Sequence, residues 1–187
     1  MNLADIGDRM MAMDAMAVTP GQVAQLALAT EAEIQGYARS CRDFCEAVPA
    51  ETLVGNLPGQ LALHARVTSP ALLGVLHFGD RVLDFACGIG RLTELAGKAV
   101  DSDIGKAGHV VGVDVSRTAL ALATQIVPGA TFVAIPGDGT LPFPPESFDA
   151  VVSTIALQHL QFFPGRHRYF LEFARVLRPD GRLLIQL

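Results

Sequence analysis

Short apolar runs that alternate with helical segments dominate the second half of this 187-residue chain. The runs are rich in β-branched and aliphatic residues along their whole length, as in strands that are buried on both faces. Such strands, separated by helices, are typical of an α/β fold with a doubly wound parallel sheet. We expect strands at residues 81–86, 109–114, 131–135, 148–154 and 182–187, and helices at 91–100, 117–126 and 165–177.

The first seventy residues are expected to be helical. Residues 19–22 (TPGQ) and 30–33 (TEAE) both have a capping-box pattern, with a hydroxyl at the N-cap and Gln or Glu at the third helical position. An apolar stripe at residues 34–48 predicts that the second of these helices runs up to a proline. We therefore divide the chain into an N-terminal helical segment, residues 1–70, and an α/β core, residues 71–187.

Composition excludes several classes of protein. A net charge of −5 argues against binding to nucleic acid through many phosphate contacts, and no apolar stretch is long enough to span a membrane. The three cysteines do not form a disulfide framework, and no signal peptide is recognisable, so a cytoplasmic location is expected. Cys41 and Cys45 lie one helical turn apart on the apolar stripe, where they could bind a metal ion. No partner His or Cys pair lies nearby in the sequence, so buried packing is favoured. No His/Cys/Asp cluster has metal-ligand spacing.

A small-residue loop at residues 84–93 (DFACGIGRLT) follows the first strand and begins a helix. Ligands of doubly wound sheets bind at this kind of junction. Asp84 precedes the loop, where its carboxylate would repel a pyrophosphate but suits an ammonium group. Thr93 stands where a dinucleotide fingerprint has its third glycine. The loop therefore favours a cationic nucleoside, and an NAD-dependent dehydrogenase is the weaker alternative.

Two further acidic residues follow the next two strands. Asp114 lies 26 residues after Gly88, near the spacing at which a carboxylate accepts hydrogen bonds from ribose hydroxyls, although an Asp before a helix also has an ordinary capping role. Asp138, in the sequence GDGT, offers an acceptor for an exocyclic adenine amine, or belongs to a surface turn. Together with the glycine loop, Asp114 is expected to bind ribose.

These segments resemble the class I S-adenosylmethionine (SAM)-dependent methyltransferases, of the small-molecule branch that includes the ubiquinone/menaquinone C-methyltransferases. The matching pieces are VLDFACGIGRLT, VVGVDVS, GDGTLPFPPESFDAVVSTIALQHL and FARVLRPDGRLLIQL, within residues 80–187. The resemblance implies a Rossmann-like sheet with strand order 3-2-1-4-5, a helical lid, and SAM as cofactor with S-adenosylhomocysteine as product. It implies a cofactor site formed by Asp84, Ala86, Cys87, Gly88, Gly90, Asp114, Val115, Asp138, Gly139 and Ser153.

The resemblance also implies a role for each part of this site. The glycine loop would surround the methionine moiety, Asp114 would bind the ribose, and Val115 would lie against the adenine. Asp138 and Gly139 would meet the amine edge of the base. The backbone of Ser153 would face the amino group of the cofactor.

The chain departs from the family in two places. Ala86 stands where the family usually has glycine, so a mildly strained left-handed backbone is expected there. The family sheet has seven strands in the order 3-2-1-4-5-7-6, whereas this chain stops inside the fifth, leaving apolar residues 183–185 on an exposed edge. We expect either a truncated product or a homodimer that covers this edge.

The leading interpretation is methyl transfer from SAM to a small, apolar acceptor by in-line displacement. His159 is the tentative catalytic base, with a packing or substrate-wall role as the alternative. Tyr37 and Arg42 are candidate lid residues. A SAM-binding protein without catalytic activity, or a partner subunit, is the alternative function.

Overall fold

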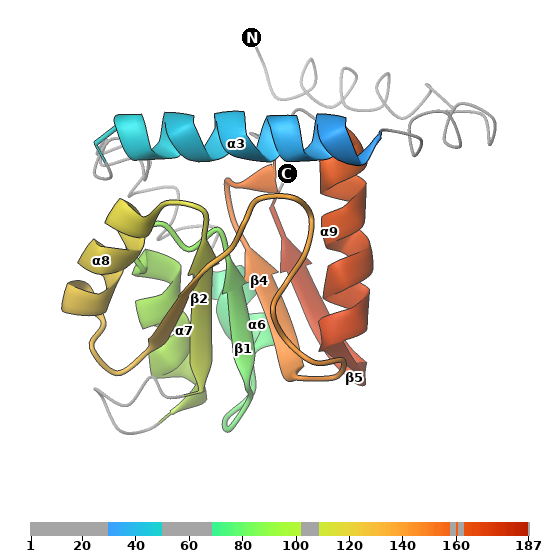
Figure 1. The fold of residues 1–187 in the computed structure, drawn as a ribbon. Helices are drawn as coiled ribbons and strands as arrows, with labels where there is room; N and C mark the ends of the chain where they lie inside the picture. The colour runs from blue at the N-terminus through green and yellow to red at the C-terminus, as the bar shows by residue number, and fades with distance from the viewer. Residues whose placement is uncertain (1–29, 50–68, 102–108, 158–159, 161–162, 187) are drawn as a thin grey trace, which may run out of the picture.

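The computed structural model describes residues 30–49, 69–101, 109–157, 160 and 163–186. Its centre is a five-stranded sheet in the order β3-β2-β1-β4-β5, in which every neighbouring pair is parallel (Figure 1). This confirms the expected fold class and strand order. The strands are β1 Val82–Phe85, β2 Val110–Asp114, β3 Thr131–Ala134, β4 Phe148–Ser153 and β5 Leu177–Ile185. The helices are α3 Glu31–Ala47, α6 Ser69–Val75, α7 Arg91–Val100, α8 Arg117–Ile126 and α9 Phe163–Val176.

Both faces of the sheet are buried, as the apolar strands predict. Along β1, Val82 packs with Leu72 of α6 and Leu92 of α7, whereas the next residue, Leu83, packs with Phe173 of α9 on the opposite face. Burying both faces stabilises the fold by about 25 cal/mol for each Å² of apolar surface that is removed from water. This packing holds the strands in place, so the loops at their carboxyl ends stand on a rigid support.

The fifth strand begins five residues earlier than expected. Leu177 already pairs with Phe148, and the ladder resumes at Arg182 opposite Ala150 after a shift in register. Pro179 and Gly181, two residue types that are uncommon inside strands, lie within this irregular stretch. An edge strand tolerates both residue types, because its outer backbone groups need no ladder partner and a bulge accommodates the extra residues.

Helix α3 begins where its capping box predicts. The Thr30 hydroxyl accepts a hydrogen bond from the Glu33 backbone N–H, and the Glu33 carboxylate accepts one from the Thr30 N–H at 2.8 Å. Ile34 and Ala38, on the predicted apolar stripe, are buried. The helix crosses above the ends of β2, β1 and β4 and reaches α9 (Figure 1). The helix expected from residue 19 lies outside the described residues.

Candidate functional site

The carboxyl group of Asp84 lies beneath the glycine loop and is 1% exposed. Thr93, at the start of α7, donates a hydrogen bond from its hydroxyl to Asp84 Oδ2 at 2.6 Å. Burial raises the pKa of Asp84 to about 7, against the lowering effect of the Thr93 hydrogen bond and with a further increase from Asp114. Asp84 therefore supports the loop from below and supplies a carboxyl group that titrates near neutrality.

The loop itself has a left-handed backbone at three of its residues. Ala86, Gly88 and Gly90 have φ values of 58°, 54° and 86°. The left-handed conformation expected for Ala86 is therefore present. Cys87 is buried between these residues, and its sulfur would lie 2.9 Å from a Cβ added at Gly112 of β2. The loop thus packs directly on the neighbouring strand.

Asp114, at the end of β2, connects the loop to the helix that follows. Its Oδ2 accepts a hydrogen bond from the Gly88 backbone N–H at 2.9 Å, and its Oδ1 accepts one from the Ser116 N–H at 2.9 Å. Burial raises the pKa of Asp114, although these backbone hydrogen bonds act in the opposite direction. Each carboxylate oxygen retains a further acceptor position, which suits two neighbouring hydroxyl groups.

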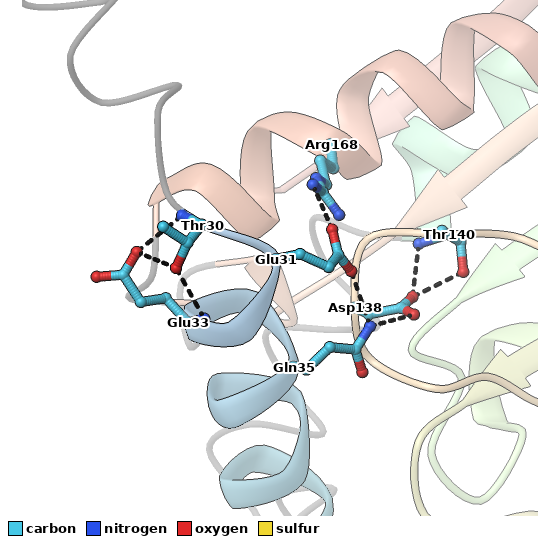
Figure 2. Close-up of polar contacts among 7 residues, drawn as sticks. All are labelled: Thr30, Glu31, Glu33, Gln35, Asp138, Thr140 and Arg168. Carbon is cyan, nitrogen blue, oxygen red and sulfur yellow. Dashed lines mark hydrogen bonds and ion pairs between the residues drawn. The ribbon is translucent and has the colours of Figure 1, made fainter.

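Asp138 lies in the loop after β3 and faces α3. Its Oδ1 accepts hydrogen bonds from the backbone N–H of Thr140 at 3.0 Å and from the Thr140 hydroxyl at 2.7 Å. Its Oδ2 accepts one from the side-chain amide of Gln35 at 3.2 Å (Figure 2). Burial alone would raise the pKa of Asp138, but the hydrogen bonds from Thr140 and Gln35 outweigh it and lower the pKa. Asp138 is an ionised acceptor.

The residues beside Asp138 are closely packed. A Cβ added at Gly137 would lie 3.2 Å from Val115 Cγ1, and one added at Gly139 would lie 2.5 Å from Arg168 Cβ. Both glycines have positive φ, 85° and 90°. Val115 therefore lies against the loop that carries Asp138 and Gly139.

Two buried hydroxyl groups near this edge have no hydrogen-bond partner among the residues that the structure describes. They are the Ser153 hydroxyl at the end of β4 and the Tyr169 hydroxyl of α9, on residues that are 0% and 2% exposed. The Ser153 backbone carbonyl, expected to face an amino group, accepts a hydrogen bond from the Gln186 N–H at 2.9 Å. Buried polar groups normally have partners, so unpartnered hydroxyls at one edge indicate a site for a polar ligand.

Three residues of this edge were not predicted as site residues. Thr93 was interpreted only as a missing glycine, Gln35 was not singled out, and Tyr169 was read as part of a helix. Helical spacing placed Gln35 and Tyr169 on helices, but no sequence pattern shows which loop each one meets. His159, the expected base, lies outside the described residues.

The described part of the chain offers neither a metal centre nor a membrane-spanning helix. No group of three or more His, Cys, Asp or Glu residues is arranged to hold a metal ion there. No described helix has the length and apolar character needed to cross a bilayer. A surface hollow lies between the segment before β4 and the end of α9, near Glu146 and Arg175, at the opposite end of the sheet from Asp114.

Curated relatives match the same part of the chain. The demethylmenaquinone methyltransferase of Symbiobacterium thermophilum is 35% identical over 115 residues, which are 58% of this chain and 43% of that protein. The 2-phytyl-1,4-naphtoquinone methyltransferase of Synechococcus elongatus is 36% identical over 112 residues, 57% of this chain and 45% of that protein. The chain thus spans less than half the length of these relatives.

Solved structures share the fold. An S-adenosylmethionine-dependent methyltransferase from Mesorhizobium loti is 29% identical, with a TM-score of 0.51 over 62% of this chain and 51% of that one. A protein from Pyrococcus horikoshii has a TM-score of 0.59 over 76% of this chain and 64% of its own, at 23% identity, which shows the fold alone. The family model described as a methyltransferase domain matches residues 83–185, more than half of the chain. This chain therefore belongs to the methyltransferase-domain family.

Proposed function

We propose that the protein is a methyltransferase that transfers a methyl group from SAM to a small-molecule acceptor. One observation carries the proposal: in a methyltransferase-domain chain, a left-handed glycine loop, Asp114 and Asp138 meet at the carboxyl edge of a parallel sheet. In a doubly wound sheet this edge is the ligand-binding edge.

The residues at this edge fit the chemical groups of SAM. Asp114 has acceptor positions for two ribose hydroxyls, and Asp138 is an ionised acceptor for the adenine amine. Val115, which lies beside Gly137, offers an apolar surface to the base. The unpartnered Ser153 hydroxyl is available to the polar end of the ligand. The sequence-predicted roles of these residues are supported by their convergence.

The glycine loop would hold the amino-acid part of the donor. Ala86, Gly88 and Gly90 turn their backbone so that a ligand can approach closely, and Cys87 packs beneath them. Asp84 would act from below, because its buried carboxyl group supplies negative charge once it ionises, at a pH near its pKa of about 7. A carboxylate there stabilises a cationic ligand more strongly than it would in water.

The acceptor is proposed to be a small, apolar molecule. The relatives named for demethylmenaquinone and phytylnaphthoquinone support this class. Bound SAM supplies an electrophilic methyl group on a good leaving group, so the protein's task is to align the acceptor and exclude water. His159, after β4, is proposed to take the acceptor's proton, with a substrate-wall role as the alternative.

Ligand titration tests the donor assignment. Calorimetry with SAM, S-adenosylhomocysteine and NAD should show binding of the first two only. Asp114→Asn, which keeps the shape of the side chain, should weaken SAM binding by about 10- to 100-fold, because hydrogen bonds to a charged group contribute about 1.5–3 kcal/mol. The matched control is Asp180→Asn, on the exposed surface of β5. Equal affinity of the two variants, or preference for NAD, would remove the proposal.

Transfer of labelled methyl from SAM to reduced quinones then tests the activity. His159→Gln should slow turnover and flatten its pH profile between pH 6 and 9 if the imidazole is the base. An unchanged profile assigns His159 to the substrate wall. Tight SAM binding with no transfer to any acceptor would instead support a SAM-binding subunit without catalytic activity.

We further propose that a second copy of the chain covers the edge of β5. In the described sheet β5 has one neighbour only, β4, and Leu183 on it is 44% exposed. Unpaired strand edges with apolar side chains favour pairing with another strand. Light scattering should find a dimer that Leu183→Lys dissociates. A monomer at all concentrations would contradict it.

The cytoplasm is the proposed location. All three cysteines, Cys41, Cys45 and Cys87, are free thiols, which suits a reducing compartment. Cell fractionation with the native gene tests this placement.

A further inference from the structure

The acceptor proposed for the adenine amine is engaged by a side chain of this protein. Asp138 Oδ1 is occupied by Thr140, and Oδ2 accepts a hydrogen bond from the carboxamide of Gln35, 103 residues away in sequence (Figure 2). A carboxamide N–H₂ and an adenine N–H₂ are both planar, neutral donors. Gln35 therefore presents to Asp138 the same chemical group that the base would present.

Helix α3 also fills the space beside this carboxylate. A Cβ added at Gly137 would lie 3.6 Å from the Ala38 carbonyl oxygen and 3.7 Å from Ala38 Cα, so the helix backbone packs on the loop. The same added Cβ would lie 3.2 Å from Val115 Cγ1, so Val115 and α3 both pack at this glycine. A purine ring placed against Val115 would need about 3.5–4 Å to the atoms on each of its faces. A base bound between Val115 and Asp138 would therefore compete with α3 in its present position.

We infer that α3 is a self-occluding lid, in which the Gln35 carboxamide stands in for the adenine amine on Asp138 and must be displaced when the methyl donor binds. The inference rests on the proposed function, because it takes Asp138 as the adenine-binding residue. It differs from a lid that only closes over bound ligand: here the lid competes with the ligand for one acceptor.

Two contacts that hold the N-terminal part of α3, next to Asp138, are of a kind that a ligand can displace. The Glu31–Arg168 ion pair, 2.9 Å long, has side chains that are 63% and 37% exposed, and exposed ion pairs contribute little in water. The Gln35–Asp138 hydrogen bond is long, at 3.2 Å. Within the described part of the chain, the buried Tyr169 hydroxyl of α9 has no hydrogen-bond partner of good geometry while α3 is in this position. The closed state therefore leaves a polar group unsatisfied at the edge that the ligand would occupy.

A substitution at Gln35 tests the competition. Gln35→Leu keeps the size and helix propensity of the side chain but removes the donor, so SAM and S-adenosylhomocysteine should bind about 3- to 10-fold more tightly, since the competent state is more populated. Ser40→Ala is the matched control, because it removes a polar side chain from the exposed side of the same helix. It should leave the affinity unchanged. Unchanged or weaker binding by Gln35→Leu would overturn the inference while the wild type still binds SAM.

A second measurement does not depend on any variant. In a crystal of the wild-type protein with S-adenosylhomocysteine, the adenine amine should lie on Asp138 Oδ2 and the Gln35 amide should have moved away. Gln35 still bonded to Asp138 in that complex would also overturn the inference. Failure of the wild type to bind SAM or S-adenosylhomocysteine is a different result, and it would remove the proposed function together with the lid.

Discussion

Folding strongly alters the acid–base chemistry of Asp84. Burial raises its pKa to about 7, so the folded protein keeps this proton at pH values where the unfolded chain, with a pKa near 4, has already released it. Between about pH 4 and pH 7 the folded state therefore binds more protons, and the free energy of unfolding falls as the pH rises. The free energy of unfolding falls by at most about 1.4 kcal/mol for each pH unit in this range.

Asp84→Asn should remove most of this slope. The variant keeps a group that can hydrogen bond with Thr93 but has no proton to release, so at pH 8 it should be more stable than the wild type by a few kcal/mol. Urea unfolding at pH 5, 6, 7 and 8 measures the effect. Asp138→Asn is the control: the pKa of Asp138 is lowered, so its contribution is lost only as the pH falls below about 4. Parallel curves for wild type and Asp84→Asn would contradict the assignment.

Single residues also show how far sequence reasoning reaches. The positive φ of Ala86 could be predicted because a family pattern places glycine there, and the structure has φ 58°. The partner of Asp84 could not be predicted. Thr93 lies nine residues later, and in the sequence it shows only that the third glycine of a dinucleotide fingerprint is missing. In the structure its hydroxyl donates a hydrogen bond to the carboxyl group of Asp84. A pattern predicts backbone shape, but a side-chain contact depends on how strand and helix pack.

At the scale of elements, the strands and helices follow from local chemistry. Apolar runs mark β1 to β4 within one residue at each end, and the capping box marks the start of α3. The fifth strand is the exception. Its first residue, Leu177, precedes Pro179 and Gly181, and only the sheet context, an edge position opposite Phe148, makes those residues acceptable in a strand. Local propensity cannot predict that a strand will lie at the edge of a sheet.

Packing between β2 and β3 permits only glycine at one position. A Cβ added at Gly112 would lie 2.7 Å from ring atoms of Phe132 and 2.9 Å from Cys87 Sγ. Gly112→Ala should therefore destabilise the fold by about 1–3 kcal/mol and weaken SAM binding by displacing the loop at Cys87. Thermal unfolding and calorimetry measure the two effects.

Two further variants isolate the cause. Gly74→Ala, in α6, introduces a Cβ with no heavy atom within 4 Å and should stabilise the protein by about 0.5–1 kcal/mol, because alanine favours a helix. Adding Phe132→Leu to Gly112→Ala should recover part of the loss, since the smaller side chain relieves the contact. No recovery would mean that the overlap with Phe132 is not the source of the cost.

At the scale of the whole molecule, strand order determines which loops meet. Strands β3, β2 and β1 are adjacent in the sheet and parallel. Gly88, Asp114 and Asp138 lie at or just after the carboxyl ends of these three strands, so they meet at one edge of the sheet. The sequence predicts this convergence once the fold class is recognised. It does not predict that α3 crosses that edge, because Gln35 and Asp138 are 103 residues apart and no periodic pattern links them.

The attachment of α3 to the sheet should be weaker than the sheet itself. Arg42 donates a hydrogen bond to the Pro136 carbonyl oxygen at 2.7 Å, and the Glu46 carboxylate accepts one from the Thr118 hydroxyl at 2.6 Å. These contacts lie at the surface, whereas β1 and β4 are held by a core buried on both faces. Local opening of α3 is therefore expected at a lower free energy than global unfolding.

Amide hydrogen exchange can separate the two events. Arg42→Ala should speed exchange of the α3 amides by about 3- to 10-fold, the effect of losing about one surface hydrogen bond, and leave the β1 and β4 amides unchanged. Arg39→Ala removes the same charge from an exposed position of the same helix and should change neither set. Arg42→Ala could instead accelerate exchange of the sheet amides as much as that of the α3 amides. The helix would then unfold together with the core, and α3 could not open as a separate lid.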